Sequence, residues 1–254
     1  INGNYQLRNN NVFIQYLTKL LPNCGDLIFD NQNLYVHEPV IFSIHPHGLI
    51  PFGTIYNFRF NCKRLEKLKK HLPIFLEGKI VTGGATFNFF FPVVRELYLF
   101  LGGVDCSRQN LSNFLKNGYS VSVFLGGARE SGYSGCGSNR LIVNNRWGLF
   151  KLALENGIDI IPVYTFQENN FYEQYFSDSF IFEFVHKFTG LWVPIGKINL
   201  KKLKYTTVVG KAISVEKLPK YSKNDVIVLR EKYKKELSYL FENCLLYTSP
   251  SPRD

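Results

Sequence analysis

Two histidines flank a proline at the end of the apolar run over residues 40–44, in the order His45-Pro46-His47-Gly48. Proline fixes its own φ and favours extended geometry in the residue before it, so we expect His45 to continue a strand and His47 to turn away. Gly48 leaves space where a substrate carbonyl or hydroxyl can approach. Two imidazoles in this pattern indicate proton transfer or metal binding, and simple packing is the alternative.

A carboxylate follows another apolar run, in Gly126-Gly127-Ala128-Arg129-Glu130. A histidine accepts a proton from a hydroxyl more readily when a carboxylate binds its other ring nitrogen and stabilises the imidazolium. Glu130 is the candidate for that role, and a solvated glutamate in a glycine-rich loop is the alternative. Gly126 and Gly127 are candidates to present backbone N–H groups to a phosphate or to a developing oxyanion.

Two arginines occupy predicted helix starts, Arg146 at the start of a helix over 146–156 and Arg108 just after the predicted N-cap Ser107. A cation gains nothing from the helix dipole at an N-terminus, so each indicates an anionic ligand nearby. A plain surface role is the alternative for both.

Other catalytic signatures are incomplete. Ser134 lacks the closing glycine of a nucleophile elbow, because Cys136 stands there. No Gly-x-Gly-x-x-Gly or P-loop motif occurs. His45 and His47 lack an evident third ligand cluster for zinc. A hydrolase and a metalloenzyme are therefore less favoured, and we expect no metal.

The hydrophobic pattern predicts alternating elements to position these groups. It indicates helices over 12–20, 49–60, 108–117, 146–156 and from Ser222 onward, and strands over 40–44, 119–125, 158–166 and 205–209. This order predicts an α/β protein, a single-domain layered fold with a mixed, mostly parallel sheet flanked by helices. Ligands in such folds bind where the strands end and the loops gather, so the His45 and Glu130 segments are expected to meet.

Composition narrows the classes of partner. A length of 254 residues with 45% hydrophobic content allows one substantial core. A net charge of +10 favours nucleic acid, anionic headgroups or a phosphate-bearing cofactor. The basic residues are dispersed and no nucleic-acid module appears, which argues against nucleic acid. An aromatic content of 16% suits a surface that contacts lipid or a long apolar ligand.

The ends, the cysteines and the longest apolar stretch carry further expectations. The chain begins at Ile1 without any methionine, which predicts that the natural start is absent, and 245–254 (LLYTSPSPRD) is predicted to be a non-native tail after a domain over 1–244. Five scattered cysteines indicate a reducing compartment. The stretch over 87–104 is interrupted by polar residues and falls short of a membrane span.

Six ordered sequence blocks together resemble the diacylglycerol O-acyltransferase type 2 family, which includes monoacylglycerol and wax-alcohol acyltransferases. They are HPHG at 45–48; RE at 95–96 with GG at 102–103 and SR at 107–108; GGARE at 126–130; NRWGL at 145–149 with LA at 152–153 and Gly157; PVYTF at 162–166 with EN at 168–169; and VVG at 208–210. The family usually has glycine after the phenylalanine of the fifth block, where this chain has Gln167.

The resemblance implies an acyl-CoA-dependent O-acyltransferase of the glycerolipid type that converts diacylglycerol to triacylglycerol. Monoacylglycerol or a long-chain alcohol as acceptor, or a non-catalytic lipid-binding relative, are the alternatives. It implies His47 as the base, His45 as its neighbour and Glu130 as the residue that orients the base. Further residues are implied to bind substrate: Gly48, Gly126, Gly127, Arg108, Arg146 and Asn169.

The resemblance also implies partners and a location. Acyl-CoA is the donor substrate, a neutral glycerolipid or fatty alcohol is the acceptor, and no cofactor is bound permanently. The expected setting is the endoplasmic reticulum membrane or the lipid-droplet surface, with the catalytic domain facing the cytosol. For Arg146 and Arg108, binding of the CoA phosphates and structural ion pairing are both open.

Overall fold

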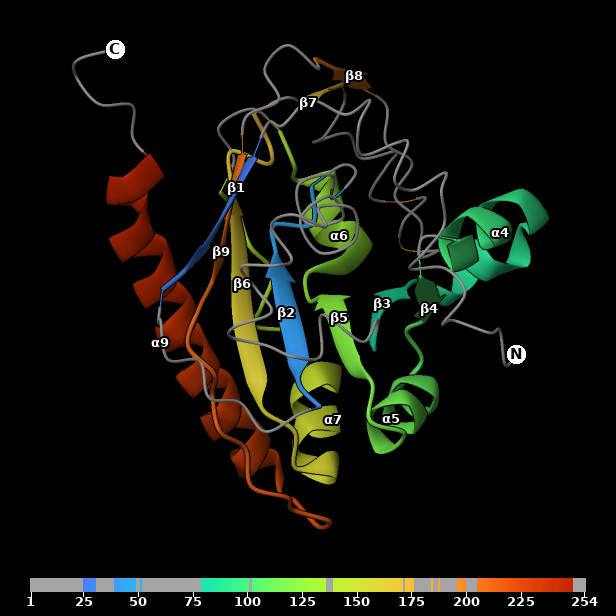
Figure 1. Cartoon of the computed structure of the whole chain (residues 1–254), viewed down its shortest axis with the longest axis vertical. Coiled ribbons are helices and arrows are strands. Elements are labelled where there is room, and N and C mark those ends of the chain that lie inside the picture. The colour runs from blue at the N-terminus through green and yellow to red at the C-terminus, as the bar shows by residue number, and fades with distance from the viewer. Residues whose placement is uncertain are drawn as a thin grey trace.

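A seven-stranded sheet forms the centre of the computed structural model (Figure 1). The strand order is β1 (Gly25–Phe29), β9 (Tyr205–Val209), β6 (Ile160–Phe166), β2 (Ile41–His45), β5 (Ser120–Phe124), β3 (Ile80–Gly84) and β4 (Gly103–Asp105). Neighbouring strands pair in parallel except β6 with β9. The predicted mixed, mostly parallel sheet is thereby confirmed.

The structure describes residues 25–30, 39–48, 51, 79–100, 102–135, 139–170, 172–175, 184, 187, 196–199 and 205–248. A separate antiparallel pair joins β7 (Tyr172–Gln174) to β8 (Gly196–Ile198). The predicted helices over 12–20 and 49–60 lie outside the described residues.

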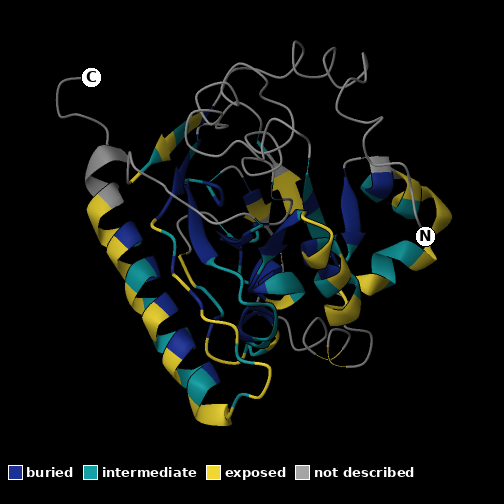
Figure 2. Cartoon of the chain, turned by 60° about the horizontal axis from the view of Figure 1, so that its bottom comes forward, coloured by how far each residue is buried: buried dark blue, intermediate teal, exposed yellow. Residues whose placement is uncertain are grey.

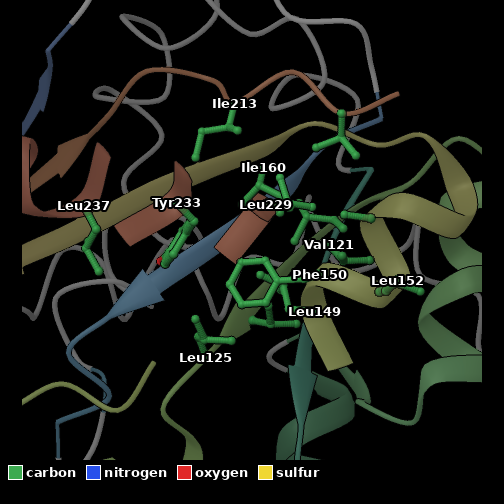
Figure 3. Close-up of a cluster of buried hydrophobic side chains, with 14 of the residues drawn as sticks. Val121, Leu125, Leu149, Phe150, Leu152, Ile160, Ile213, Leu229, Tyr233 and Leu237 are labelled. Carbon is green, nitrogen blue, oxygen red and sulfur yellow. The ribbon is translucent and has the colours of Figure 1, made fainter. Parts of the chain in front are cut away.

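Three helices cover one face of the sheet: α5 (Arg108–Lys116), α7 (Gly148–Asn156) and α9 (Lys223–Thr248). Their buried side chains join strand residues in one large cluster, part of which is drawn in Figure 3. Phe150 and Tyr233 lie at its centre, fully buried, with their rings 5.5 Å apart. Figure 2 shows α9 with buried residues along one side and exposed residues along the other.

Strand β2 divides its side chains between the two faces of the sheet. Ile41 belongs to the helix-covered cluster, whereas Phe42 and Ile44 belong to a second cluster with residues of β6 and β9. Because side chains alternate along a strand, Ser43 and His45 share the face of Ile41. The fold thus directs His45 toward the helix-covered side.

Most predicted elements that fall on described residues are confirmed, with shifted ends. Helix α7 begins at Gly148 instead of residue 146. Arg146 belongs to a preceding turn, in which its backbone N–H donates a hydrogen bond to the carbonyl of Val143. It ends at Gly157, whose φ of 66° is the left-handed geometry of a helix C-cap. At the start of α9, the hydroxyl and backbone N–H of Ser222 both bond to the Asp225 carboxylate.

The structure adds detail to three segments of the sequence. Helix α9 continues to Thr248 and so extends into 245–254, the segment predicted to be a non-native tail, and the origin of that segment stays a prediction. Glu130 does not lie in a solvated glycine-rich loop, which was the alternative for it, because Gly127–Gly132 forms a short helix, α6, in which Glu130 is buried. The stretch over 87–104 contains a 3-10 helix η4 (Thr86–Phe90), helix α4 (Pro92–Phe100) and the start of β4. None of the helices in the described ranges has the length and apolar character that a membrane span requires.

Gln167 has a φ of 64°, and it alone among the described non-glycine residues has a positive φ. It occupies the first position of the turn over 167–170 that follows β6. Left-handed backbone geometry is easiest for glycine, which explains physically why the family that this chain resembles usually has glycine there.

Candidate active site

The candidate site lies at the carboxyl edge of the sheet. His45 is the last residue of β2, and α6, which carries Glu130, follows β5 directly. Because β2 and β5 are neighbouring parallel strands, their carboxyl ends lie at the same edge, and Figure 1 shows α6 beyond them. The expected meeting of the two sequence segments is confirmed.

His45 and Glu130 form a buried pair. Their side chains are 0% and 1% exposed, and Nδ1 of His45 lies 3.2 Å from both carboxylate oxygens of Glu130. The carboxylate also accepts the backbone N–H of His47 at Oε1, at 2.8 Å, and that of Ile142 at Oε2, at 2.9 Å. Three hydrogen-bond donors therefore fix the position of the carboxylate.

These donors decide the charge of Glu130. Burial alone raises the pKa of a carboxyl group, but here the neighbouring His45 and the hydrogen bonds from His45, Ile142 and His47 outweigh burial. The pKa of Glu130 is accordingly held below its ordinary value of 4.5. Glu130 is ionised at neutral pH and acts as a hydrogen-bond acceptor.

An ionised acceptor determines the tautomer of His45. Nδ1 must carry the proton that it donates to Glu130, so the lone pair of the neutral ring is on Nε2. That nitrogen is buried and has no hydrogen-bond partner among the described residues. The pair is therefore arranged to accept a proton at Nε2 and to stabilise the resulting imidazolium through Glu130.

Two tyrosines enclose the pair. The ring of Tyr233 lies 6.4 Å from that of His45, and its hydroxyl bonds to Ser43 at 2.7 Å. Tyr164, which pairs with His45 across the β2–β6 register, donates its hydroxyl to Asn139 at 3.3 Å. Burial and the nearby Glu130 charge raise the pKa of both tyrosines, so both stay neutral. Because the two rings keep water away from the pair, the attraction between His45 and Glu130 is stronger than it would be in water.

His47 turns away from the strand, as expected. It is half-buried, its Nδ1 donates to the carbonyl of Gly48 at 2.9 Å, and its ring lies 5.1 Å from that of Phe124. Burial lowers its pKa below 6.5, although the Gly48 bond and Glu130 oppose this. The structure brings Glu130 to the ring of His45 and to the backbone N–H of His47, and the role of His47 as the base stays a prediction.

The paired glycines provide space for side chains of the site. A Cβ on Gly126 would lie 2.0 Å from Oε2 of Glu130, and one on Gly127 would lie 3.3 Å from Nη2 of Arg146. Gly127 also has a φ of 58°. The absence of side chains at the two glycines thus leaves room for the carboxylate of Glu130 and the guanidinium of Arg146. Binding of an oxyanion by the backbone N–H groups of the glycines stays a prediction.

Arg146 lies at the site, although it precedes α7 instead of beginning it. Nη2 donates to the carbonyl of Gly126, and Nε is buried without a hydrogen-bond partner in the described part of the chain. Burial lowers its pKa, Glu130 opposes this shift and Arg129 adds to it. A partly buried cation beside the pair can interact with negative charge that enters the site.

Arg108 is engaged elsewhere. Its guanidinium forms an ion pair with Glu155 in the last turn of α7 and a 2.7 Å hydrogen bond to Tyr221. The structural ion pair is therefore the alternative that the structure supports for Arg108. Its sequence signal, a cation after an N-cap, did not reveal this partner from another helix.

Asn169 is buried in the turn after β6, and Gly48 follows His47 with a φ of 63°. Because β6 and β2 are parallel neighbours, both residues lie at the edge of the sheet that carries the pair. Their binding of substrate stays a prediction.

Sequence reasoning missed the N–H donor of Ile142 and the two tyrosines. A backbone N–H donor cannot be recognised from the residue type. The two-residue spacing of Ser43 and His45, however, indicates that both lie on the same face of the strand and make part of that face polar. No group of three or more histidine, cysteine or acidic side chains that could hold a metal occurs in the ranges described above.

The structure defines an α/β protein with a mixed, mostly parallel sheet and a buried His–Glu pair at its carboxyl edge, an arrangement that is suited to general-base chemistry. The chain belongs to the diacylglycerol acyltransferase family, because the model of that family matches residues 4–248.

Similar proteins agree with this family. Diacylglycerol O-acyltransferase 2 of Mus musculus is 31% identical over 233 residues, which are 84% of this chain and 58% of that protein. 2-Acylglycerol O-acyltransferase 1 of Mus musculus is 30% identical over 246 residues, 89% of this chain and 70% of that protein. Diacylglycerol O-acyltransferase 2 of Dictyostelium discoideum is 35% identical over 150 residues, 57% of this chain and 42% of that protein. The chain spans about half the length of the diacylglycerol acyltransferases it matches.

A solved structure supports the fold. The chain is similar to the 1-acyl-sn-glycerophosphate acyltransferase PlsC of Thermotoga maritima, with a TM-score of 0.52 over 94% of this chain and 80% of that protein. The sequence identity is 13%, so this likeness concerns the fold alone.

Proposed function

We propose that the protein transfers a fatty acyl group from acyl-CoA to the hydroxyl of diacylglycerol and forms triacylglycerol. The observation that carries the proposal is the buried His45 at the edge of the sheet, whose Nδ1 lies on Glu130 and whose Nε2 has no hydrogen-bond partner in the described part of the chain. A hydroxyl placed at that nitrogen would supply the missing hydrogen bond and the proton to be removed.

The reaction follows from this geometry. Nε2 of His45 accepts the hydroxyl proton while the hydroxyl oxygen bonds to the thioester carbonyl carbon, whose oxygen becomes an oxyanion. When the carbonyl re-forms, the C–S bond breaks, and the departing CoA sulfur takes the proton back from Nε2. Glu130 remains ionised and stabilises the transient imidazolium.

The location of Arg146 supports a role toward negative charge. Its guanidinium interacts electrostatically with Glu130 beside Gly126 and Gly127, and its Nε has no partner among the described residues. We assign it to the acyl-CoA donor, either at the oxyanion or at a phosphate. Gly48 and Asn169 are assigned to the same edge as substrate-contacting residues.

The proposed setting is the endoplasmic reticulum membrane or the lipid-droplet surface, with the site facing the cytosol. Acyl-CoA is water-soluble and the acceptor is a lipid, so the two substrates meet where a membrane borders water. A net charge of +10 supports work with an anionic donor beside anionic headgroups.

A second acceptor has a specific observation in its favour. 2-Acylglycerol O-acyltransferase 1 covers as much of this chain as the diacylglycerol enzymes do, at 30% identity. Monoacylglycerol is therefore the leading alternative, followed by a long-chain alcohol and by a lipid-binding protein without catalysis.

The test is acyl transfer by membranes that contain the protein, with labelled acyl-CoA and, separately, diacylglycerol, monoacylglycerol or a long-chain alcohol. We expect labelled triacylglycerol from the parent and none above background from His45→Ala. Arg108→Ala is the matched control, because its ion pair lies at another interface. Absence of product from every acceptor, with folded and membrane-bound protein, would leave the non-catalytic lipid binder.

A further inference from the structure

The surface of the described residues carries one run of exposed apolar side chains. Four of the nine exposed large hydrophobic side chains fall between residues 90 and 94: Phe90 at 74% exposed, Phe91 at 48%, Val93 at 83% and Val94 at 37%. The fifth residue, Pro92, is exposed as well. We call residues 90–94 the apolar patch. Consecutive exposed apolar residues are avoided in proteins unless they contact something.

The patch is held in place from its inner side. Tyr98 packs where Gly84 and Gly103 have no side chains, since a Cβ on Gly84 would lie 2.6 Å from the Tyr98 ring. Leu99 is buried, and the ring of Phe89 lies 5.8 Å from that of Tyr98. One side of helix α4 therefore packs against the sheet. Residues 90–94 are not on that side and so remain exposed to solvent.

The aromatic residues of this segment support one another. The ring of Phe87 makes edge contacts with those of Phe90 and Phe91, at 6.3 and 5.0 Å. Such contacts fix the orientation of large side chains that would otherwise be mobile in water. The result is a preformed apolar surface of aromatic and β-branched residues.

The patch lies at the edge of the sheet that carries His45. Segment 86–90 leaves the carboxyl end of β3, and β3 pairs in parallel with β5, the neighbour of β2. Figure 1 shows α4 beside β3 and β4 at this part of the sheet. A surface against the patch therefore lies at the same edge of the sheet as the site.

Charge favours one occupant. The patch contains no charged residue, Arg95 and Glu96 follow it as an ion pair with side chains 39% and 70% exposed, and the chain as a whole carries +10. A surface with an apolar interior and anionic headgroups matches an apolar patch on a cationic protein. A second positively charged copy of the chain does not provide this complementarity.

We propose that the apolar patch inserts into the headgroup region of a lipid bilayer and holds the carboxyl edge of the sheet against it. This rests on the proposed function in one respect, because a lipid acceptor explains why the site faces the bilayer. Shallow insertion of Phe90 and Val93 would let a lipid hydroxyl reach the site without leaving the membrane surface.

The test is flotation of the full chain with vesicles of phosphatidylcholine and phosphatidylserine. We expect the double variant Phe90→Ser/Val93→Ser to lower the vesicle partition coefficient by about tenfold, because two apolar side chains are lost from the bilayer contact. The matched control is Val228→Ser/Tyr239→Ser, which removes two side chains of α9 that are 59% and 53% exposed. The control is expected to bind like the parent.

A second measurement reports insertion directly. The indole in Phe90→Trp should be quenched by brominated lipids, and that in Val228→Trp should not. Equal partitioning of both double variants, or an unquenched Trp at residue 90, would overturn the proposal. So would a patch variant that changes only the oligomeric state in light scattering, since the patch would then cover a second copy.

Failure of the proposed function gives a different result. His45→Ala is expected to bind vesicles like the parent even when transfer is lost. Vesicle binding that depends on the patch, with no transfer to any acceptor, would contradict catalysis and leave the membrane surface supported.

Discussion

At the scale of single residues, the site depends on which histidine the carboxylate orients. Glu130 binds Nδ1 of His45 and only the backbone N–H of His47, so the two histidines are not equivalent. The ring of His47 is instead bonded to the carbonyl of Gly48 and packed near Phe124. This favours His45 as the base and makes His47 a neighbouring group with a separate contribution.

Substitution of the two histidines separates these roles. We expect His45→Ala to lower kcat by about 10²–10⁴-fold, the range for loss of a general base. His47→Ala should cost less than about 100-fold, because the pair of His45 and Glu130 remains. Single-turnover transfer with folded variants measures both. A larger loss in His47→Ala than in His45→Ala would return the base role to His47.

The two arginines give a second comparison at this scale. Arg146→Ala should raise the KM for acyl-CoA or lower kcat by about 10–100-fold, because a cation beside the site is lost. Arg108→Ala should leave both constants within about twofold, because an exposed ion pair contributes little. Steady-state kinetics with acyl-CoA as the varied substrate measures this. An unaltered Arg146→Ala enzyme would make that residue purely structural.

At the scale of elements, α6 is a short helix that begins with two glycines packed closely against charged side chains. Gly126 borders the carboxylate of Glu130, and Gly127 borders Arg146. The strand β2, buried along its full length, holds His45 in register with Tyr164 of β6. A small displacement of α6 would therefore move Glu130 relative to a fixed His45.

Gly126→Ala is expected to produce that displacement. The new Cβ would lie 2.0 Å from Oε2 of Glu130, so the carboxylate must move, and a shift of this kind costs about 100-fold in rate. Gly148→Ala is the control, because nothing lies within 4 Å of its added Cβ and it stands in the first turn of α7. That control should be neutral or stabilise by about 0.5–1 kcal/mol. Transfer rates and thermal melts compare the two, and a fully active Gly126→Ala protein would contradict the tight packing.

At the scale of the whole molecule, the fold buries ionisable groups in defined charge states and so makes stability depend on pH. His47 has a lowered pKa, which means that the folded state prefers the neutral ring. Glu130 also has a lowered pKa, so the folded state prefers the carboxylate. In both cases the unfolded chain binds protons more readily than the folded one, and stability falls as pH falls.

The pH windows differ between the two groups. The contribution of His47 is complete above 6.5 and is lost as pH falls from there through its folded pKa. The contribution of Glu130 is complete above 4.5 and is lost below that value. We expect Tm to fall in both windows, with the upper one diminished in His47→Gln and the lower one in Glu130→Gln. Thermal unfolding against pH measures this, and a parent Tm that stays constant down to pH 4.5 would contradict the His47 part.

The sequence alone determined the layers of the fold and the segments that form the site. Strand β2, helices α5 and α9 and the meeting of His45 with Glu130 followed from periodicity, caps and the carboxyl-edge rule, because these depend on neighbours along the chain. The resemblance to the acyltransferase family came from short ordered blocks for the same reason.

Only the tertiary structure decided which groups pair. Glu130 binds His45 instead of the ring of His47, Arg108 pairs with Glu155 while Arg146 lies against Gly126, and residues 90–94 remain uncovered. Each of these depends on contacts between side chains from different elements, whose direction is set by packing and by where a strand ends. Residue type and spacing do not encode those contacts locally, which is why they became visible only in three dimensions.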